Sequence, residues 1–228
     1  MNSIHTIAFD ADDTLWINEP YFQEAEAAFC RLFENDHPYP FVAGELLTTE
    51  ICNLHLYGYG IKGFMLCMAE TAVRISHGRA PLSLMSEILA IGHDLLQKPV
   101  ELLEGVTETL NALTGKYRLI AATKGDLLDQ ERKLKKSGLL ACFHHIEIMS
   151  DKKTEDYRKL MDHLDCRPEH FLMIGNSMKS DILPVLETGG YAAYVPYHVT
   201  WAHEQHDDTP ESERFMQVKN IRELLKFL

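Results

Sequence analysis

The sequence has little positive charge. Its 22 Lys and Arg residues are outnumbered by 34 Asp and Glu over 228 residues, which gives a formal net charge of −12 at pH 7. Nucleic-acid binding depends on clusters of Lys and Arg that contact phosphate backbones. We therefore expect no nucleic-acid partner, although a small anionic substrate is compatible with a site that carries its own metal ion and lysine.

The sequence also lacks long apolar runs and paired cysteines. No segment approaches the ~20 apolar residues that cross a bilayer, and no signal peptide is visible at the N-terminus. The five cysteines are odd in number and scattered, and none lies in a CxxC pair; this is typical of reduced thiols rather than a disulfide framework. We predict a cytoplasmic protein with no membrane partner, and the sequence leaves its oligomeric state open.

The hydrophobic pattern divides the chain into two kinds of region. After a short apolar strand, Ile4 to Phe9, the block 17–97 has helix-like segments and no strand, starting with a helix at 20–35. From residue 98, strands and helices alternate: strands at 117–123, 144–149, 171–174 and 191–195, and helices at 101–113, 127–136, 155–164, 181–187 and 221–228. Repeated βα units indicate a parallel sheet with helices on both faces.

This pattern predicts an α/β protein. We expect a Rossmann-like parallel-sheet core formed by residues 1–16 and 98–228, and an inserted all-α cap domain at 17–97.

Polar clusters follow four of the predicted strands. In chain order they are Asp10 and Asp12, Thr123 and Lys124, Lys152 and Lys153, and Asn176 and Asp181 within GNSMKSD. Parallel topology brings the carboxyl ends of the strands to one edge of the sheet, where α/β proteins bind ligands. Each cluster alone is a weak signal, but the four in this order strongly indicate a single site.

With these residues in place, the chain resembles the haloacid dehalogenase superfamily, specifically its phosphatase-type members with a helical cap. DADDT matches the first motif, DxDxT, and Thr123, Lys152 and GNSMKSD match the other three. The resemblance implies that Asp10 is a nucleophile that becomes an aspartyl-phosphate. It implies that Asp12 protonates the leaving group and then activates water. It further implies that Mg²⁺ is held by Asp10, by the backbone carbonyl of Asp12 and by the fourth motif.

The residue chemistry suits these roles independently. A carboxylate attacks phosphorus to give a hydrolysable acyl-phosphate, and a second carboxyl two residues away exchanges a proton with the leaving oxygen. Mg²⁺ prefers oxygen ligands. Thr123, Lys124 and Lys152 offer a hydroxyl and positive charges to phosphate. We expect a Mg²⁺-dependent phosphatase that acts on a small phosphorylated metabolite.

Asn176 departs from the motif, in which Gly-Asp is frequent. Its side-chain oxygen remains available to the metal, directly or through water, but it brings no charge. With Asp10, Asp12 and Asp181 ionised, Mg²⁺ and Lys152 balance the site to zero. An extra aspartate would add a charge–charge repulsion of roughly 4 kcal/mol at 4 Å and an effective dielectric near 20. We predict that Asn176 favours phosphate binding at some expense of metal affinity.

Several interpretations stay open at this point. A haloacid dehalogenase, a phosphomutase and a non-catalytic binding protein are alternatives to the phosphatase, and phosphonate hydrolysis would need a cap lysine, of which Lys62 is the only candidate. Thr123 could instead be the N-cap of the following helix. Asp181 could instead be an acidic residue stabilised by the positive N-terminal end of a helix dipole, and Lys124 could lie at the rim of the site without contacting the substrate. The spacing to Tyr157 favours Lys152 over Lys153 as the motif lysine.

Two further segments are expected to be structural. Asp13 suits a turn position that Asp tolerates and Gly often fills. The segment from His198 to Asp208 carries metal-ligand residue types, but its spacing matches no zinc pattern, so we predict a surface loop.

Overall fold

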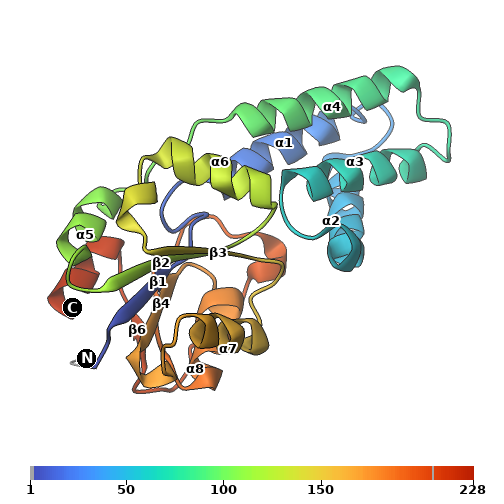
Figure 1. Ribbon diagram of the computed structural model, residues 1–228. Coiled ribbons are helices and arrows are strands. Elements are labelled where there is room, and N and C mark those ends of the chain that lie inside the picture. The colour runs from blue at the N-terminus through green and yellow to red at the C-terminus, as the bar shows by residue number, and fades with distance from the viewer. Residues whose placement is uncertain (1–2, 207) are drawn as a thin grey trace. The chain divides into compact units, whose positions relative to one another are not determined.

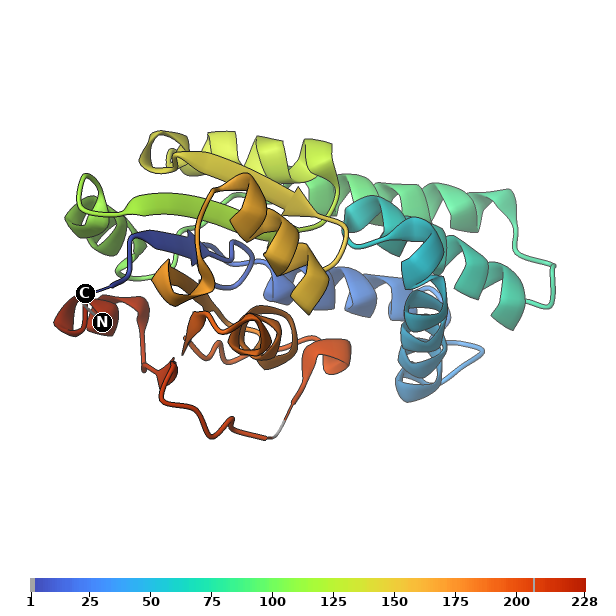
Figure 2. The same ribbon diagram turned by 60° about the horizontal axis from the view of Figure 1, so that its bottom comes forward.

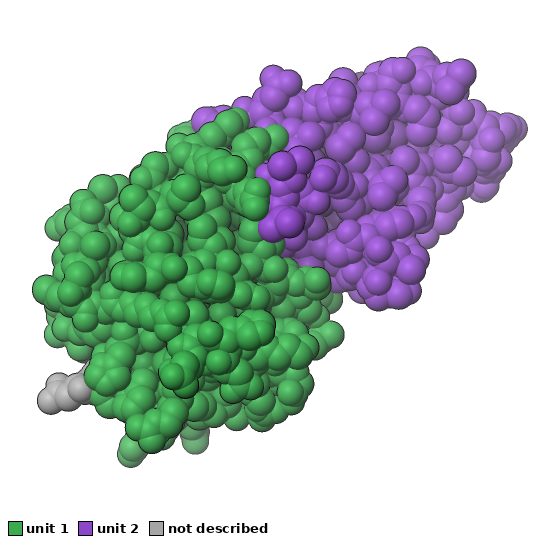
Figure 3. Space-filling view, viewed as in Figure 1, with its two compact units in different colours: residues 1–19, 100–124, 130–228 green, residues 20–99, 125–129 purple. Residues whose placement is uncertain are grey.

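The computed structural model describes residues 3–206 and 208–228. The chain forms two compact units, which Figure 3 shows in different colours. Unit 1 consists of Met1–Glu19, Val100–Lys124 and Gln130–Leu228, and unit 2 of Pro20–Pro99 with Gly125–Asp129.

Unit 1 is built on a six-stranded sheet in the order β3-β2-β1-β4-β5-β6, in which every pairing is parallel (Figure 1). The strands are β1 Thr6–Phe9, β2 Arg118–Lys124, β3 His145–Met149, β4 Phe171–Gly175, β5 Tyr191–Tyr194 and β6 Phe215–Gln217. β1 lies between β2 and β4, with Phe9 opposite Ala121 on one side and Ile174 on the other. The segment that follows β1 therefore emerges between the ends of its two neighbours.

Helices cover both faces of this sheet, as the views in Figures 1 and 2 show. Successive strand residues alternate between two cores, with Ile7 and Phe9 in one and Ala8 in the other. The first core includes residues of α5 (Val106–Leu113) and the unit 1 part of α6 (Leu127–Ser137). The second includes residues of α7 (Thr154–His163) and α8 (Leu183–Thr188). The predicted Rossmann-like α/β fold is confirmed.

The regular elements of unit 2, among its described residues, are all helices, and the unit has its own apolar core. Its helices are α1 Glu19–Arg31, α2 Tyr39–Tyr57, α3 Ile61–Ile75 and α4 Leu82–Gln97. Phe29, Leu46 and Met68 are fully buried in this core. In residues 3–206 and 208–228, no helix has the length and apolarity that a membrane crossing requires.

Four predicted helices differ from the structure. The helix predicted at 20–35 ends at Arg31. The one predicted at 101–113 begins only at Val106, because Glu101 accepts a hydrogen bond from Ile17 and Leu102 pairs with Trp16.

The other two differences lie toward the C-terminus. The helix predicted at 181–187 starts as a π-helical turn, Met178–Ile182, before α8. The C-terminal helix is a 3-10 helix, Ile221–Lys226, and the short β6 was not predicted.

A substitution in the sheet core tests this account of the fold. Leu172 is fully buried in β4, so Leu172→Ala removes packed methyl groups and should lower the free energy of unfolding by about 2–5 kcal/mol. Leu140→Ala is the control, because the side chain of Leu140 is exposed and surface changes stay within about 0.5 kcal/mol. Urea denaturation measures both, and equal losses would contradict the assignment of Leu172 to the core.

Candidate active site

Asp10 lies at the point where β1 leaves the sheet. Its backbone N–H donates to Ile174 O at 2.8 Å, so the strand pairing holds it in place, and its side chain is buried. The chain then reverses at Asp13, which has a φ of 60°, as predicted for this turn position. The Asp13 carboxylate accepts the backbone N–H groups of Asn18 and Glu19. This turn presents Asp10 and Asp12 at the end of the sheet.

Lys152 joins two buried carboxylates from different strand ends. Its Nζ lies 2.5 Å from Asp10 Oδ1 and 2.7 Å from Asp181 Oδ1. Burial lowers the pKa of Lys152, but the two carboxylate charges outweigh burial and raise that pKa above its usual range. Lys153, in contrast, is 77% exposed and pairs with Asp151. Of the two candidate lysines, Lys152 is the one that points into the site.

Asp181 is held rigidly beside this lysine. Its Oδ2 accepts the backbone N–H of Ser177 at 3.0 Å. A Cβ on Gly175 would come within 2.2 Å of the same oxygen, so only glycine fits there. Burial raises the pKa of Asp10 to about 7, because Lys152 offsets only part of the desolvation and of the repulsion from Asp181. The two buried carboxylates, Asp10 and Asp181, thus share one lysine.

The side-chain amide of Asn176 lies among oxygen atoms. With its nitrogen turned toward them, it donates to Asp10 Oδ2, Asp12 O and Thr14 Oγ1, each at 3.2 Å. A carboxylate oxygen, a backbone carbonyl and an amide thus converge, and these are ligands that Mg²⁺ accepts. Among the described residues, no group of three or more His, Cys, Asp or Glu side chains is arranged to hold a metal. A metal here would depend on the amide and the backbone carbonyl.

The Asp12 carboxylate turns away from these oxygens and is held by three donors. Trp16 Nε1 donates to Oδ1 at 2.7 Å, Gln130 Nε2 to Oδ2 at 2.8 Å, and Lys133 Nζ to Oδ1 at 2.5 Å. Sequence reasoning missed all three donors. Gln130 and Lys133 are three residues apart on α6 and so lie on one helix face, a spacing that was available in the sequence.

Thr123 and Lys124 end β2 at the same edge of the sheet. Thr123 is buried, and its hydroxyl lies 3.3 Å from Lys124 O. Lys124 Nζ binds Glu204 Oε1 at 2.6 Å and Ser180 Oγ at 2.8 Å. Glu204 belongs to the predicted surface loop 198–208, whose described residues are exposed or half-buried, and its own side chain is only 13% exposed. Asp207 of that segment lies outside the described residues.

Two features belong to unit 2. Lys62 is 57% exposed and pairs with Asp126 at 3.0 Å.

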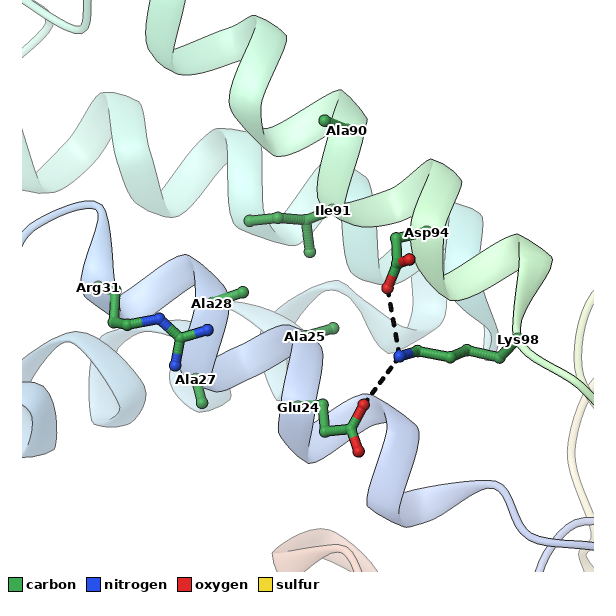
Figure 4. Close-up of a pocket in the computed structure, with 9 residues that line it drawn as sticks. All are labelled: Glu24, Ala25, Ala27, Ala28, Arg31, Ala90, Ile91, Asp94 and Lys98. Carbon is green, nitrogen blue, oxygen red and sulfur yellow. Dashed lines mark hydrogen bonds and ion pairs between the residues drawn. The ribbon is translucent and has the colours of Figure 1, made fainter.

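A cavity of about 520 Å³ lies between α1 and α4, where Lys98 bridges Glu24 and Asp94 (Figure 4). None of the predicted catalytic residues lines this cavity, so it is not part of the candidate site.

Comparison with known proteins places the sequence in a family. Residues 4–185 match the family model of haloacid dehalogenase-like hydrolases. A haloacid dehalogenase-like family hydrolase from Xanthomonas campestris is 37% identical, with a TM-score of 0.86 over 96% of this chain and 88% of that one. None of the curated proteins matches the sequence.

More distant structures share the fold. A predicted phosphoglycolate phosphatase from Haemophilus somnus 129PT is 16% identical, with a TM-score of 0.64 over 100% of this chain and 99% of that one. A 2-haloacid dehalogenase from Pseudomonas syringae pv. tomato DC3000 is 17% identical, with a TM-score of 0.61 over 98% and 97%. Likeness at this level does not distinguish the two chemistries.

Removal of the central lysine should destabilise the protein. Lys152→Met leaves Asp10 and Asp181 buried without their common positive partner, so we expect a loss of about 3–5 kcal/mol in the free energy of unfolding. Lys153→Met removes the neighbouring, exposed lysine and should cost no more than about 1 kcal/mol. Adding Asp181→Asn to Lys152→Met should recover part of the loss. Urea denaturation would contradict the account if the two lysine variants lost equal stability.

Proposed function

The chain belongs to the haloacid dehalogenase-like hydrolase family, and we propose that it is a Mg²⁺-dependent phosphatase that hydrolyses a small phosphomonoester. The observation that carries this proposal is the placement of Asp12. It is a second carboxylate two residues from Asp10, and three donors hold it apart from the group around Lys152. A leaving alkoxide needs a proton, and a carboxyl group at this position is suited to deliver it.

The reaction would proceed in two displacements at phosphorus. Asp10 forms an O–P bond while the P–O bond to the alcohol breaks, and Asp12 gives its proton to the departing oxygen. Water then attacks the aspartyl-phosphate, Asp12 takes up the proton, and inorganic phosphate and free Asp10 result. Lys152 fixes the nucleophile through its contact with Asp10 Oδ1, and the second oxygen, Oδ2, faces the Thr14 hydroxyl and the Asn176 amide, each at 3.2 Å.

The residues present fit a magnesium ion. Asp10, the backbone carbonyl of Asp12 and, once its amide turns over, the side-chain oxygen of Asn176 would hold it, because the Asn176 amide lies 3.2 Å from Asp10 Oδ2 and from Asp12 O. Asp181 contributes less directly than the sequence suggests, since its two oxygens bind Lys152 and Ser177 N–H. When bound, the ion supplies positive charge to the phosphoryl oxygens.

Two other parts of the chain complete the proposal. Thr123 and Lys152 would contact the phosphoryl group, together with Lys124, which follows Thr123 at the end of β2. The inserted helical unit would act as a cap that excludes bulk water and selects the substrate.

Haloacid dehalogenation is the main rival. It also uses an aspartate nucleophile, but halide leaves as an anion and needs no proton, so a second carboxyl group at Asp12 would have no leaving group to protonate. A phosphomutase would keep the same aspartates and would return the phosphoryl group to a sugar instead of to water.

A substrate panel tests the proposed reaction. Purified protein should release phosphate from at least one small phosphomonoester with Mg²⁺ present and not with EDTA, and it should release no halide from 2-haloacids. Asp10→Asn should abolish turnover, because an amide is not a phosphoryl acceptor. Asp12→Asn should slow it by about 10²–10⁴-fold, with Lys153→Met as a surface control. Halide release, or full activity in Asp10→Asn, would refute the proposal.

Asn176→Asp tests the metal ligands. Because Lys133 also pairs with Asp12, the loaded site is more positive than the sequence-based charge count indicates. A carboxylate at 176 should tighten Mg²⁺ binding by at least about tenfold, since a charged oxygen is a better partner for a hard cation. It should also weaken inhibition by phosphate at saturating Mg²⁺. Calorimetric titration that shows unchanged metal affinity would place residue 176 outside the reach of the ion.

A further inference from the structure

The Glu204 carboxylate lies in a pocket made by three donors at the active-site edge of the sheet. We call Lys124, Ser177 and Ser180 the Glu204 pocket. Lys124 Nζ binds Oε1 at 2.6 Å, Ser180 Oγ donates to Oε2 at 2.6 Å, and Ser177 Oγ also donates to Oε2. One ammonium and two hydroxyls around one carboxylate form a complete anion-binding arrangement.

The pocket is buried and strongly favours a negative charge. Ser177 and Ser180 are buried, and the Lys124 side chain is 14% exposed. Burial by itself raises the pKa of Glu204, but the charge of Lys124 and the hydrogen bonds from Lys124, Ser177 and Ser180 outweigh it and lower the pKa to about 2. The carboxylate is therefore ionised at neutral pH and is held as an anion.

The part of the chain that carries Glu204, residues 196–206, contributes no residue to either apolar core of unit 1. Between Val195 and Val218, no described residue is buried. Lys179 of the fourth-motif turn also contacts this segment: its Nζ donates to the backbone carbonyl of His203 at 3.0 Å and lies 3.1 Å from the His203 ring Nε2. Residues 196–206 are outside the apolar cores. An anion that displaced the Glu204 carboxylate would therefore not have to disrupt a hydrophobic core.

The pocket adjoins the catalytic residues through the chain itself. Lys124 follows Thr123, Ser177 follows Asn176, and Ser180 precedes Asp181. The same two strand ends thus carry both the candidate phosphate-binding residues and the donors around Glu204. Lys124 Nζ lies 2.8 Å from Ser180 Oγ, and the next residue, Asp181, shares Lys152 with Asp10.

We propose that Lys124, Ser177 and Ser180 form a second anion subsite that binds a carboxylate of the substrate, and that Glu204 occupies this subsite until the substrate displaces it. This inference rests on the proposed phosphatase function and narrows its substrate class to phosphomonoesters that carry a carboxylate. Glu204 then competes with the substrate carboxylate for the same donors. When the substrate binds, the ion pair between Lys124 and Glu204 is replaced by one between Lys124 and the substrate carboxylate.

Binding of acetate tests the subsite without any turnover. Acetate is titrated into metal-free wild type, Glu204→Ala and the double variant Glu204→Ala/Lys124→Met, and the backbone amide signals of Ser177 and Ser180 are followed by NMR. We expect Glu204→Ala to bind acetate at least about tenfold more tightly than wild type, and the double variant to lose that gain. Glu204→Gln, which keeps the size of the side chain, is measured in parallel in case the alanine variant unfolds.

A matched substrate pair tests the role of the subsite in specificity. Phosphoglycolate and its carboxamide have the same skeleton and differ in one charge. In Glu204→Gln the ratio of the KM for the amide to the KM for the acid should rise about tenfold over wild type, because the acid no longer competes with an internal carboxylate. Glu211→Gln is the control: it removes a charge from an exposed position of the same segment and should leave the ratio unchanged.

These experiments distinguish a failure of the proposed anion subsite from a failure of the proposed phosphatase function. If acetate binds Glu204→Ala and Glu204→Gln no better than wild type, the pocket only fastens the segment and the inference is wrong. Equal KM ratios in Glu204→Gln and Glu211→Gln would likewise overturn it. If acetate binds as expected but no phosphomonoester is hydrolysed, the subsite exists and the failure lies in the proposed phosphatase function.

Discussion

The candidate site depends on one ammonium group placed between two buried carboxylates. Lys152 follows β3, Asp10 follows β1 and Asp181 lies in the turn after β4, so the ion pairs fasten three strand ends to one another. None of the three charges could be buried alone, since an unpaired buried charge costs several kcal/mol. The residue before this turn must be glycine, because a side chain on Gly175 would collide with the Asp181 carboxylate.

This arrangement gives two nearby aspartates different surroundings. Asp10 is buried against Lys152, whereas Asp12 turns toward Trp16, Gln130 and Lys133. Pairs of acids in distinct environments are how enzymes divide the work of nucleophile and proton carrier. The neutral Asn176 beside them donates to the oxygens that a cation would bind. A bound cation would replace these hydrogen bonds, with the Asn176 amide turned so that its oxygen faces the ion.

Much of the fold could be predicted from the sequence because its signals are local. Short apolar runs that end in polar clusters identify the strands, and parallel topology then brings Asp10, Lys152 and Asp181 together. The contacts that were missed depend on side chains far apart in the sequence. Lys133 reaches Asp12 from the face of α6, and Glu204 reaches Lys124 from a segment without periodicity. The sequence predicts an α-helix at the C-terminus, where the structure has a 3-10 helix. Its buried residues, Ile221 and Leu224, are three positions apart, a spacing that both kinds of helix allow.

The central claim is that Asp10 becomes covalently phosphorylated during turnover. Its most direct test is an acid quench of the protein during reaction with a phosphomonoester, followed by peptide mass spectrometry of the segment that contains Asp10. We predict one phosphoryl group on Asp10, which is absent from Asp10→Asn and is lost on treatment with hydroxylamine. An organic ester on Asp10 formed from a haloacid, or turnover with no adduct on this residue, would contradict the account.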